Sequence, residues 1–181
     1  GGGEESFGYM VGDAVRDKDA VAAILLVSEI AAQAKASGSS LYQELLNLYI
    51  DFGCYKESLI SITKKGIEGA NEIKQMMIDL REYPQKEING QRVICIEDYQ
   101  ASKGKDFMNN EEFEIHIPKS NVLIYYLEDG SKICARPSGT EPKIKFYFSV
   151  NGVLDTIENA ESVEKELDNK IAGIISAMKL K

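Results

Sequence analysis

A short segment, residues 136–142, contains the kinds of groups that bind an oxyanion. Its candidate ligands are Arg136, Ser138, Gly139 and Thr140, and Lys145 follows shortly after them. A guanidinium can make two parallel bonds to phosphate, hydroxyls donate further bonds, and a glycine lets backbone N–H groups come close to the anion. Pro, Ser and Gly also occur in ordinary surface turns, but an ordinary turn needs no convergence of cations and hydroxyls. We therefore interpret the segment as a phosphate-binding loop.

The opening segment, Gly3-Glu4-Glu5-Ser6-Phe7-Gly8, is not a nucleotide-binding loop although it is rich in glycine. It lacks the Gly-Lys-Ser/Thr ending of such loops, and its carboxylates would repel phosphate. One carboxylate can instead accept hydrogen bonds from two adjacent hydroxyls of a sugar. The segment suits recognition of a neutral polyol, while a disordered terminus explains it equally well.

The charged run Arg16-Asp17-Lys18-Asp19 precedes an apolar stretch of helical periodicity. A solvated helix start is the simplest explanation of such a run. A cation at a helix N-terminus opposes the helix dipole, however, so Lys18 suggests a functional role. His116 and the acidic residues before it lack the spacing of metal ligands, and we expect no metal site in this chain.

The composition indicates an ordinary globular protein of 181 residues with 44% hydrophobic residues. A net charge of −8 argues against a nucleic-acid partner, which needs a broad basic face. The three cysteines are widely separated and odd in number, so we expect reduced thiols. The longest apolar run, residues 20–27, is too short to cross a bilayer, and no charged leader precedes it. We expect a cytoplasmic protein without a membrane partner.

The first 52 residues predict a short helical leader. Asp17 is a candidate N-cap for a helix through the apolar run 21–34, and Gly38 a candidate stop. A second helix is expected from Ser40, which opens a possible capping box, to the glycine at position 53.

Residues 53–181 predict an antiparallel α+β domain. The expected strands are 59–63, 91–96, 121–127, 132–135 and 143–150, and the expected helices are 67–80 and 163–178. Asp129-Gly130 predicts a tight hairpin turn between two of the strands. Residues 100–119 are polar, and we expect a long surface connection there.

Three motifs, in this order and spacing, carry a family resemblance: Gly-Glu-Glu-Ser-Phe-Gly, Val-Arg-Asp-Lys-Asp, and Arg-Pro-Ser-Gly-Thr-Glu-Pro-Lys-Ile-Lys-Phe-Tyr. Together they resemble the C-terminal part of the α-D-phosphohexomutase superfamily, which includes phosphoglucomutases and phosphomannomutases. The resemblance implies that residues 1–52 are the tail of the third mutase domain. Residues 53–181 would be the fourth domain, with a TATA-binding-protein-like fold in which helices cover one face of an antiparallel sheet.

The resemblance also implies roles for individual residues. Glu4 and Ser6 would hold sugar hydroxyls, and Lys18 would lie near the transferring phosphate. The non-reacting phosphate would be bound by Arg136, Ser138, Gly139 and Thr140. Lys145 stands where some members carry an arginine that reaches the same phosphate, and it lacks the fork of a guanidinium.

The implied activity is interconversion of 1-phospho and 6-phospho sugars through a phosphoserine and a bisphosphosugar. The family's phosphoserine and its Asp-x-Asp-x-Asp magnesium motif belong to earlier domains and are absent from this sequence. We therefore expect a piece of a longer enzyme that needs Mg²⁺, a phosphosugar and its own preceding domains, and that is inactive alone. A phosphopentomutase-type parent, suggested by Gly8-Tyr9-Met10, and a non-catalytic phosphate-binding or interaction module remain alternatives.

Overall fold

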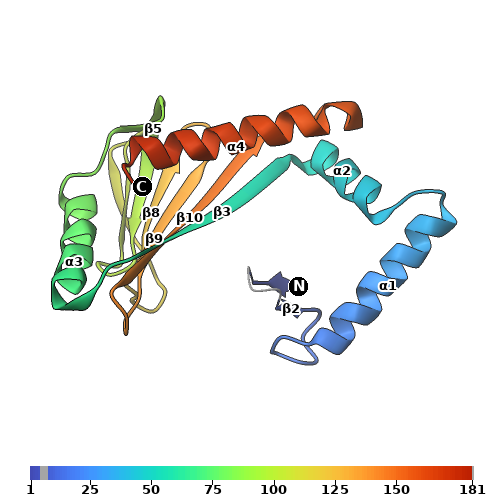
Figure 1. Cartoon of the computed structure of the whole chain (residues 1–181), viewed down its shortest axis with the longest axis horizontal. Coiled ribbons are helices and arrows are strands. Elements are labelled where there is room, and N and C mark those ends of the chain that lie inside the picture. Colours follow the sequence, from blue (N-terminus) through green and yellow to red (C-terminus); the bar gives the residue numbers. More distant parts are fainter. Residues whose placement is uncertain (5–7, 181) are drawn as a thin grey trace. The chain divides into compact units, whose positions relative to one another are not determined.

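The structure is a computed structural model that describes residues 1–4 and 8–180. The chain forms two compact units, Gly1–Phe52 (unit 1) and Gly53–Lys181 (unit 2). Figure 1 shows the elements of each unit along the colour ramp from blue to red.

Unit 1 holds a small hairpin and two helices. Strands β1 (Gly2–Gly3) and β2 (Tyr9–Met10) pair antiparallel, and helices α1 (Ala20–Ala36) and α2 (Leu41–Phe52) follow. Both helices lie where the apolar periodicity predicts them. Gly38 and Gly53 adopt positive φ angles of 74° and 95° after the two helix ends, as a residue without a Cβ can.

The N-cap of α1 is Asp19, so the prediction of Asp17 is wrong. The Asp19 carboxylate accepts hydrogen bonds from the backbone N–H groups of Val21 and Ala22 at 3.0 and 3.2 Å. Asp17 accepts at 2.7 Å from the backbone N–H of Lys18, which precedes the helix. A cap must reach the second or third residue of its helix, and here only Asp19 has that spacing.

Helix α1 exposes most of its apolar side chains. Val21, Ile24 and Leu25 keep 79%, 67% and 68% of their surface accessible, and Ala34 is buried. A helix that is apolar on all sides is typical of one buried among further elements. Among the described residues no single helix is long and apolar enough to cross a membrane; α1 and α2 meet those criteria only together, across a 91° bend.

Unit 2 contains an antiparallel sheet with helices α3 (Gly66–Glu82) and α4 (Ala160–Ala177). Its remaining elements are β3 (Cys54–Thr63), β4 (Glu87–Ile88), β5 (Gln91–Asp98), β6 (Lys103–Asp106), β7 (Glu111–Glu114), β8 (Leu123–Leu127), β9 (Lys132–Pro137), β10 (Lys143–Gly152) and the 3-10 helix η1 (Ile157–Asn159). The strands lie in the order β3-β10-β9-β8-β5-β6-β7, with β4 beside β5. Every neighbouring pair is antiparallel, which confirms the predicted α+β class.

The two faces of the sheet differ because side chains alternate along each strand. On β10, Ile144, Phe146, Phe148 and Val150 are buried. Helices α3 and α4 pack on this face through residues that include Ile73, Met77, Leu167, Ile171 and Ile174. Among the described residues of unit 2, no helix packs on the opposite side, which we call the uncovered face. The prediction that helices cover one face of the sheet is confirmed.

The expected long connection at 100–119 is partly wrong, because it contains the hairpin β6–β7. The Asp106 carboxylate accepts from the backbone N–H groups of Met108 and Asn109 at 2.7 and 3.2 Å, and Asn110 adopts a φ of 55°. These are turn conformations that Asp and Asn favour. The hairpin escaped prediction because its strands are short and polar, without a clean apolar alternation.

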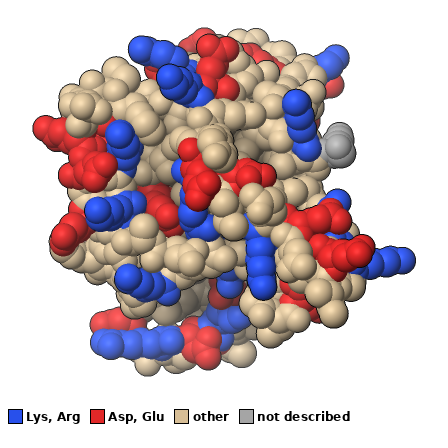
Figure 2. All heavy atoms as spheres, turned by 90° about the vertical axis from the view of Figure 1, so that its left-hand side faces the viewer, with Lys and Arg blue, Asp and Glu red and all other residues tan. Residues whose placement is uncertain are grey.

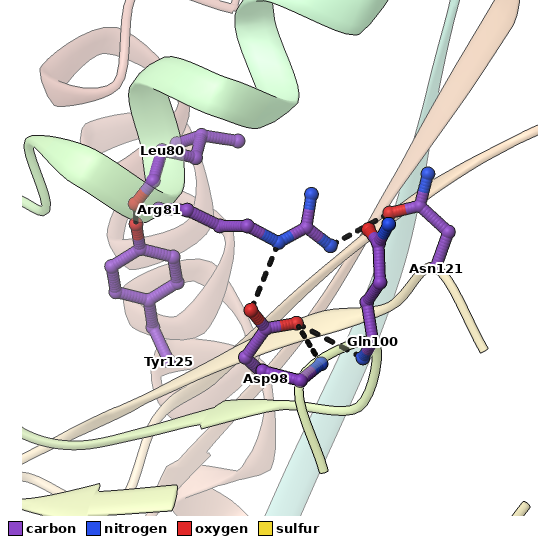
Figure 3. Close-up of polar contacts among 7 residues, drawn as sticks. Leu80, Arg81, Asp98, Gln100, Asn121 and Tyr125 are labelled. Carbon is purple, nitrogen blue, oxygen red and sulfur yellow. Dashed lines mark hydrogen bonds and ion pairs between the residues drawn. The ribbon is translucent and has the colours of Figure 1, made fainter. Parts of the chain in front are cut away.

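The C-terminal end of α3 is fixed to the sheet by side chains (Figure 3). The Arg81 guanidinium donates to Asp98 Oδ2 at 3.1 Å and to Asn121 Oδ1 at 2.7 Å, and the Tyr125 hydroxyl donates to the backbone carbonyl of Leu80. Asp98 also accepts from the backbone N–H of Gln100. Because one end of α3 is held in this way, its other end has a defined place beside the loop that joins β9 and β10.

Candidate functional site

The predicted phosphate-binding segment, residues 136–142, begins in the last two residues of β9, and its residues 138–142 form the loop that connects β9 to β10. The backbone N–H of Ser138 donates to the carbonyl of Lys143, and that of Lys64 donates to the carbonyl of Pro142, both at 2.8 Å. The Ser138 hydroxyl oxygen accepts from the N–H groups of Thr140 and Glu141 at 3.4 and 3.3 Å. These bonds fix the conformation of the loop. They leave the hydroxyl proton of Ser138 available to a ligand.

Arg136 and Lys145 lie directly opposite each other on β9 and β10. Both belong to the uncovered face, because their neighbours Ala135 and Ile144 are buried on the other side. No ion pair joins either cation to a carboxylate among the described residues. The Lys145 ammonium lies 5.8 Å from the centroid of the Tyr147 ring. Two adjacent cations without an acidic partner form a local anion-attracting site.

Gly139 leaves the middle of the loop open. No atom lies within 4 Å of the position that a Cβ on this residue would take, so a ligand can approach the backbone there. On another side, the loop forms one wall of a groove of about 570 Å³ whose other wall is α3. The lining includes Ile67, Lys74 and Asn121. The loop is therefore accessible to a small ligand.

The neighbouring thiol is not poised as a nucleophile. Cys134 shares the face of Arg136 two residues earlier on β9, and burial raises the pKa of its thiol although Arg136 and Lys132 act in the opposite direction. A raised pKa keeps the thiol protonated at neutral pH. In Figure 2, which shows one side of the chain, cations and acids are interspersed. The anion site is a local group of cations in a chain whose net charge is −8.

The predicted sugar loop and Lys18 come together in unit 1. The backbone N–H of Glu4 donates to the carbonyl of Gly8 at 2.9 Å, closing the hairpin of β1 and β2. The Lys18 ammonium donates to Glu4 Oε2 at 3.0 Å, and this bond together with the charge of Glu4 raises the pKa of Lys18. Both side chains remain about half exposed. Ser6, the other predicted sugar ligand, lies outside the described residues.

Gly8 is required where the Lys18 side chain crosses the hairpin. A Cβ at Gly8 would lie 2.1 Å from Lys18 Cδ, so a larger residue would displace the lysine. A groove of about 440 Å³ adjoins this contact and is lined partly by Gly8, Tyr9, Lys18 and Ile24. The structure thus brings Glu4 beside Lys18 in unit 1, and Arg136, Ser138, Thr140 and Lys145 around one loop in unit 2.

Lys143 is not among the predicted site residues. It is paired through its backbone with Ser138 and shares the uncovered face with Lys145, two residues further along β10. The alternation of the predicted strand 143–150 already places Lys143 on the same face as Lys145. Among the described residues no group of three His, Cys, Asp or Glu could hold a metal ion. The residues present therefore do not fit the Mg²⁺ of the family, and we assign no metal-dependent step to them.

The chain is similar to phosphoglucomutases over most of its length. Residues 1–49 match the family model described as phosphoglucomutase/phosphomannomutase, alpha/beta/alpha domain III. A curated phosphoglucomutase from Staphylococcus haemolyticus (strain JCSC1435) is 36% identical over 170 residues, which are 94% of this chain and 30% of that protein. One from Staphylococcus aureus (strain MRSA252) is 40% identical over 147 residues, 81% of this chain and 26% of that protein. These matches support a C-terminal piece of a phosphohexomutase.

A solved structure shows the same fold. The open form of pp63/parafusin, a phosphoglucomutase from Paramecium, superposes with a TM-score of 0.56 at 18% identity, over 97% of this chain and 29% of that one. The resemblance to the C-terminal part of a phosphohexomutase is therefore confirmed. The chain spans less than a third of the length of these relatives.

Proposed function

We propose that this chain supplies substrate-binding residues to a phosphoglucomutase-type enzyme that interconverts 1-phospho and 6-phospho sugars. The observation that carries the proposal is the pair Arg136 and Lys145, opposed across β9 and β10 without an acidic partner, next to a loop that presents hydroxyls and an open glycine. The similarity to curated phosphoglucomutases supports the same reading.

In the proposed reaction, a phosphoserine of the preceding domains transfers its phosphoryl group to the free hydroxyl of a sugar monophosphate. The resulting bisphosphosugar turns around, and its other phosphoryl group returns to the serine. Such a transfer depends mainly on positioning and charge stabilisation. Arg136, Ser138, Gly139 and Thr140 would hold the phosphate that does not react, and Mg²⁺ would be held by residues outside this chain.

Glu4 and Lys18 would act at the other end of the substrate. A carboxylate at Glu4 can accept from sugar hydroxyls, and Ser6 would add a hydroxyl of its own. Lys18 would place a cation near the phosphoryl group in transfer. Its ammonium has three donors, so it can bind a substrate phosphate while it keeps its 3.0 Å bond to Glu4.

Titration of the 181-residue chain with inorganic phosphate and with glucose 1-phosphate tests the loop. Arg136→Ala should weaken the binding of both anions by roughly tenfold, since a charge-assisted hydrogen bond contributes about 1.5 kcal/mol or more. Arg92→Ala is the matched control, because Arg92 is already paired with Glu128 at 2.6 Å. Equal binding by the wild type and R136A would refute the phosphate-binding role and favour an interaction module without an anion site.

A further inference from the structure

The end of the uncovered face beside the loop carries more cations than the loop motif itself. Lys143 lies opposite Thr63, and Lys145 lies opposite Ser61 on one side and Arg136 on the other. Since side chains two residues apart on a strand share a face, Lys143 and Lys145 project to the same side. The hydroxyls of Ser61 and Thr63 are exposed on the adjoining strand β3. Three cations and two hydroxyls thus occupy one small area.

Among the described residues, no member of this cluster forms an ion pair. The ion pairs among the described residues involve other cations, namely Lys18, Lys56, Lys64, Arg81, Arg92 and Lys170. Like charges directly opposite each other across two strands are destabilising, yet Arg136 faces Lys145. An anion bound between the strands would remove that repulsion.

Lys143 is better placed for the loop than Lys145. The Lys145 ammonium lies over the ring of Tyr147, two residues further from the loop. Lys143 directly follows the loop: its backbone N–H donates to the carbonyl of Glu141, and its carbonyl accepts from the N–H of Ser138, both at 2.8 Å. Its backbone is therefore bonded to both ends of the loop, so its side chain starts from a fixed point.

We infer that Lys143, assisted by the hydroxyls of Ser61 and Thr63, binds the phosphate monoester held by the loop. This inference rests on the proposed function, because it requires an anion at the loop, but it gives roles to residues to which the resemblance assigns none. A phosphate monoester carries between −1.5 and −2 charges at pH 7, with a second pKa of about 6. The positive charge of Lys143 attracts the second negative charge of the ester. Lys143 therefore favours binding of the dianion over binding of the monoanion.

The test measures phosphate affinity at two pH values. The 181-residue chain is titrated with inorganic phosphate at pH 7.5 and at pH 5, and the backbone amide of Gly139 is followed by NMR. Lys143→Met should weaken binding roughly fivefold at pH 7.5, the upper range for a solvent-exposed charge pair, and less at pH 5, where the monoanion prevails. Lys143→Arg should retain the affinity and its pH dependence.

Two further variants separate charge from structure. Lys132→Met is the control, because Lys132 lies at the far end of β9 with its ammonium 5.7 Å from the Tyr126 ring, and it should bind phosphate as the wild type does. Thr63→Val removes a proposed donor without altering β10, and it should weaken binding about twofold. This variant keeps the inference testable if K143M disturbs the strand.

The failures of the two proposals are distinguishable. If R136A loses binding while K143M and T63V match K132M, the inference about Lys143 is wrong and the phosphate-binding loop stands. If R136A itself binds as the wild type does, the proposed function fails, and the inference fails with it.

Discussion

Single residues set the strength of the anion site through geometry. Arg136 presents a planar fork that can make two bonds to one phosphate, whereas a lysine acts as a mobile point charge. The strand register places Arg136 opposite Lys145. Ser138 and Lys143, which a backbone hydrogen bond joins, form the next pair. The site therefore combines one directional donor with cations that adjust to the ligand.

Another residue-scale contact fixes the β8–β9 hairpin to α4. The Lys170 ammonium lies 2.8 Å from Asp129 Oδ2 and donates to the backbone carbonyl of Asn151 at 3.0 Å. Burial alone would raise the pKa of Asp129, but bonds from Lys170 and Ser131 outweigh it and hold the pKa below its usual value. The contact therefore stabilises the fold while Asp129 is ionised.

Lys170→Met should lower the free energy of unfolding of unit 2 by about 1 kcal/mol at pH 7. A depressed folded-state pKa stabilises the fold above the unfolded value of about 3.9, and the gain is lost as the pH falls through the folded value. The difference between the wild type and K170M should therefore shrink below about pH 4. Hydrogen exchange of the buried β10 amides measures both the free energy of unfolding at pH 7 and its change with pH. Lys165→Met, on an exposed position of α4, is the control; a difference independent of pH would contradict the assignment.

At the scale of elements, the first turn of α3 supports the phosphate-binding loop. Gly69 is buried against the preceding segment, and a Cβ there would lie 2.5 Å from Lys64 Cβ and 2.9 Å from its carbonyl carbon. The N–H of Lys64 holds the carbonyl of Pro142, which ends the loop. The close approach of α3 thus determines where the loop sits.

Gly69→Ala should weaken phosphate binding without touching the loop, because the new methyl group pushes Lys64 away from Pro142. Overpacking of this kind costs about 1–3 kcal/mol of stability. Phosphate titration and thermal unfolding, compared with Asn71→Ala on an exposed position of the same helix, measure both effects. Unchanged affinity in G69A would show that the loop holds its shape without α3.

At the scale of the whole chain, the proposed enzyme is incomplete. The chain spans 26–30% of its curated relatives, and α1 exposes apolar side chains such as Ile24 and Leu25. Exposed apolar surface of this extent marks contact with further protein. We therefore propose that the predicted site residues of unit 1 and of unit 2 act together with residues outside this chain.

The 181-residue chain should show no conversion of glucose 1-phosphate to glucose 6-phosphate, even with Mg²⁺ and a bisphosphosugar present. It lacks both the serine motif and the Asp-x-Asp-x-Asp loop that the proposed reaction needs. The full-length phosphoglucomutase of Staphylococcus aureus is the positive control in the same coupled assay. Turnover by the chain, above that of R136A, would overturn the view that catalysis requires other domains.

Patterns of short range determined much of this protein from the sequence alone. The alternation on β10 placed its buried face, Asp129-Gly130 predicted the β8–β9 hairpin, and the periodicity of α4 predicted its buried stripe. These features follow from periods of 2 and 3.6 residues and from turn conformations, which neighbouring residues specify by themselves.

Tertiary structure decided what depends on partners distant in the chain. Thr63 faces Lys143 and Ser61 faces Lys145 only because β3 pairs with β10 across some eighty residues, and no local pattern specifies that register. The bonds of Arg81 to Asp98 and Asn121 likewise join residues that lie 17 and 40 positions apart in the chain. The sequence motif predicted the loop, while the pairing of the strands determined which cations lie around it.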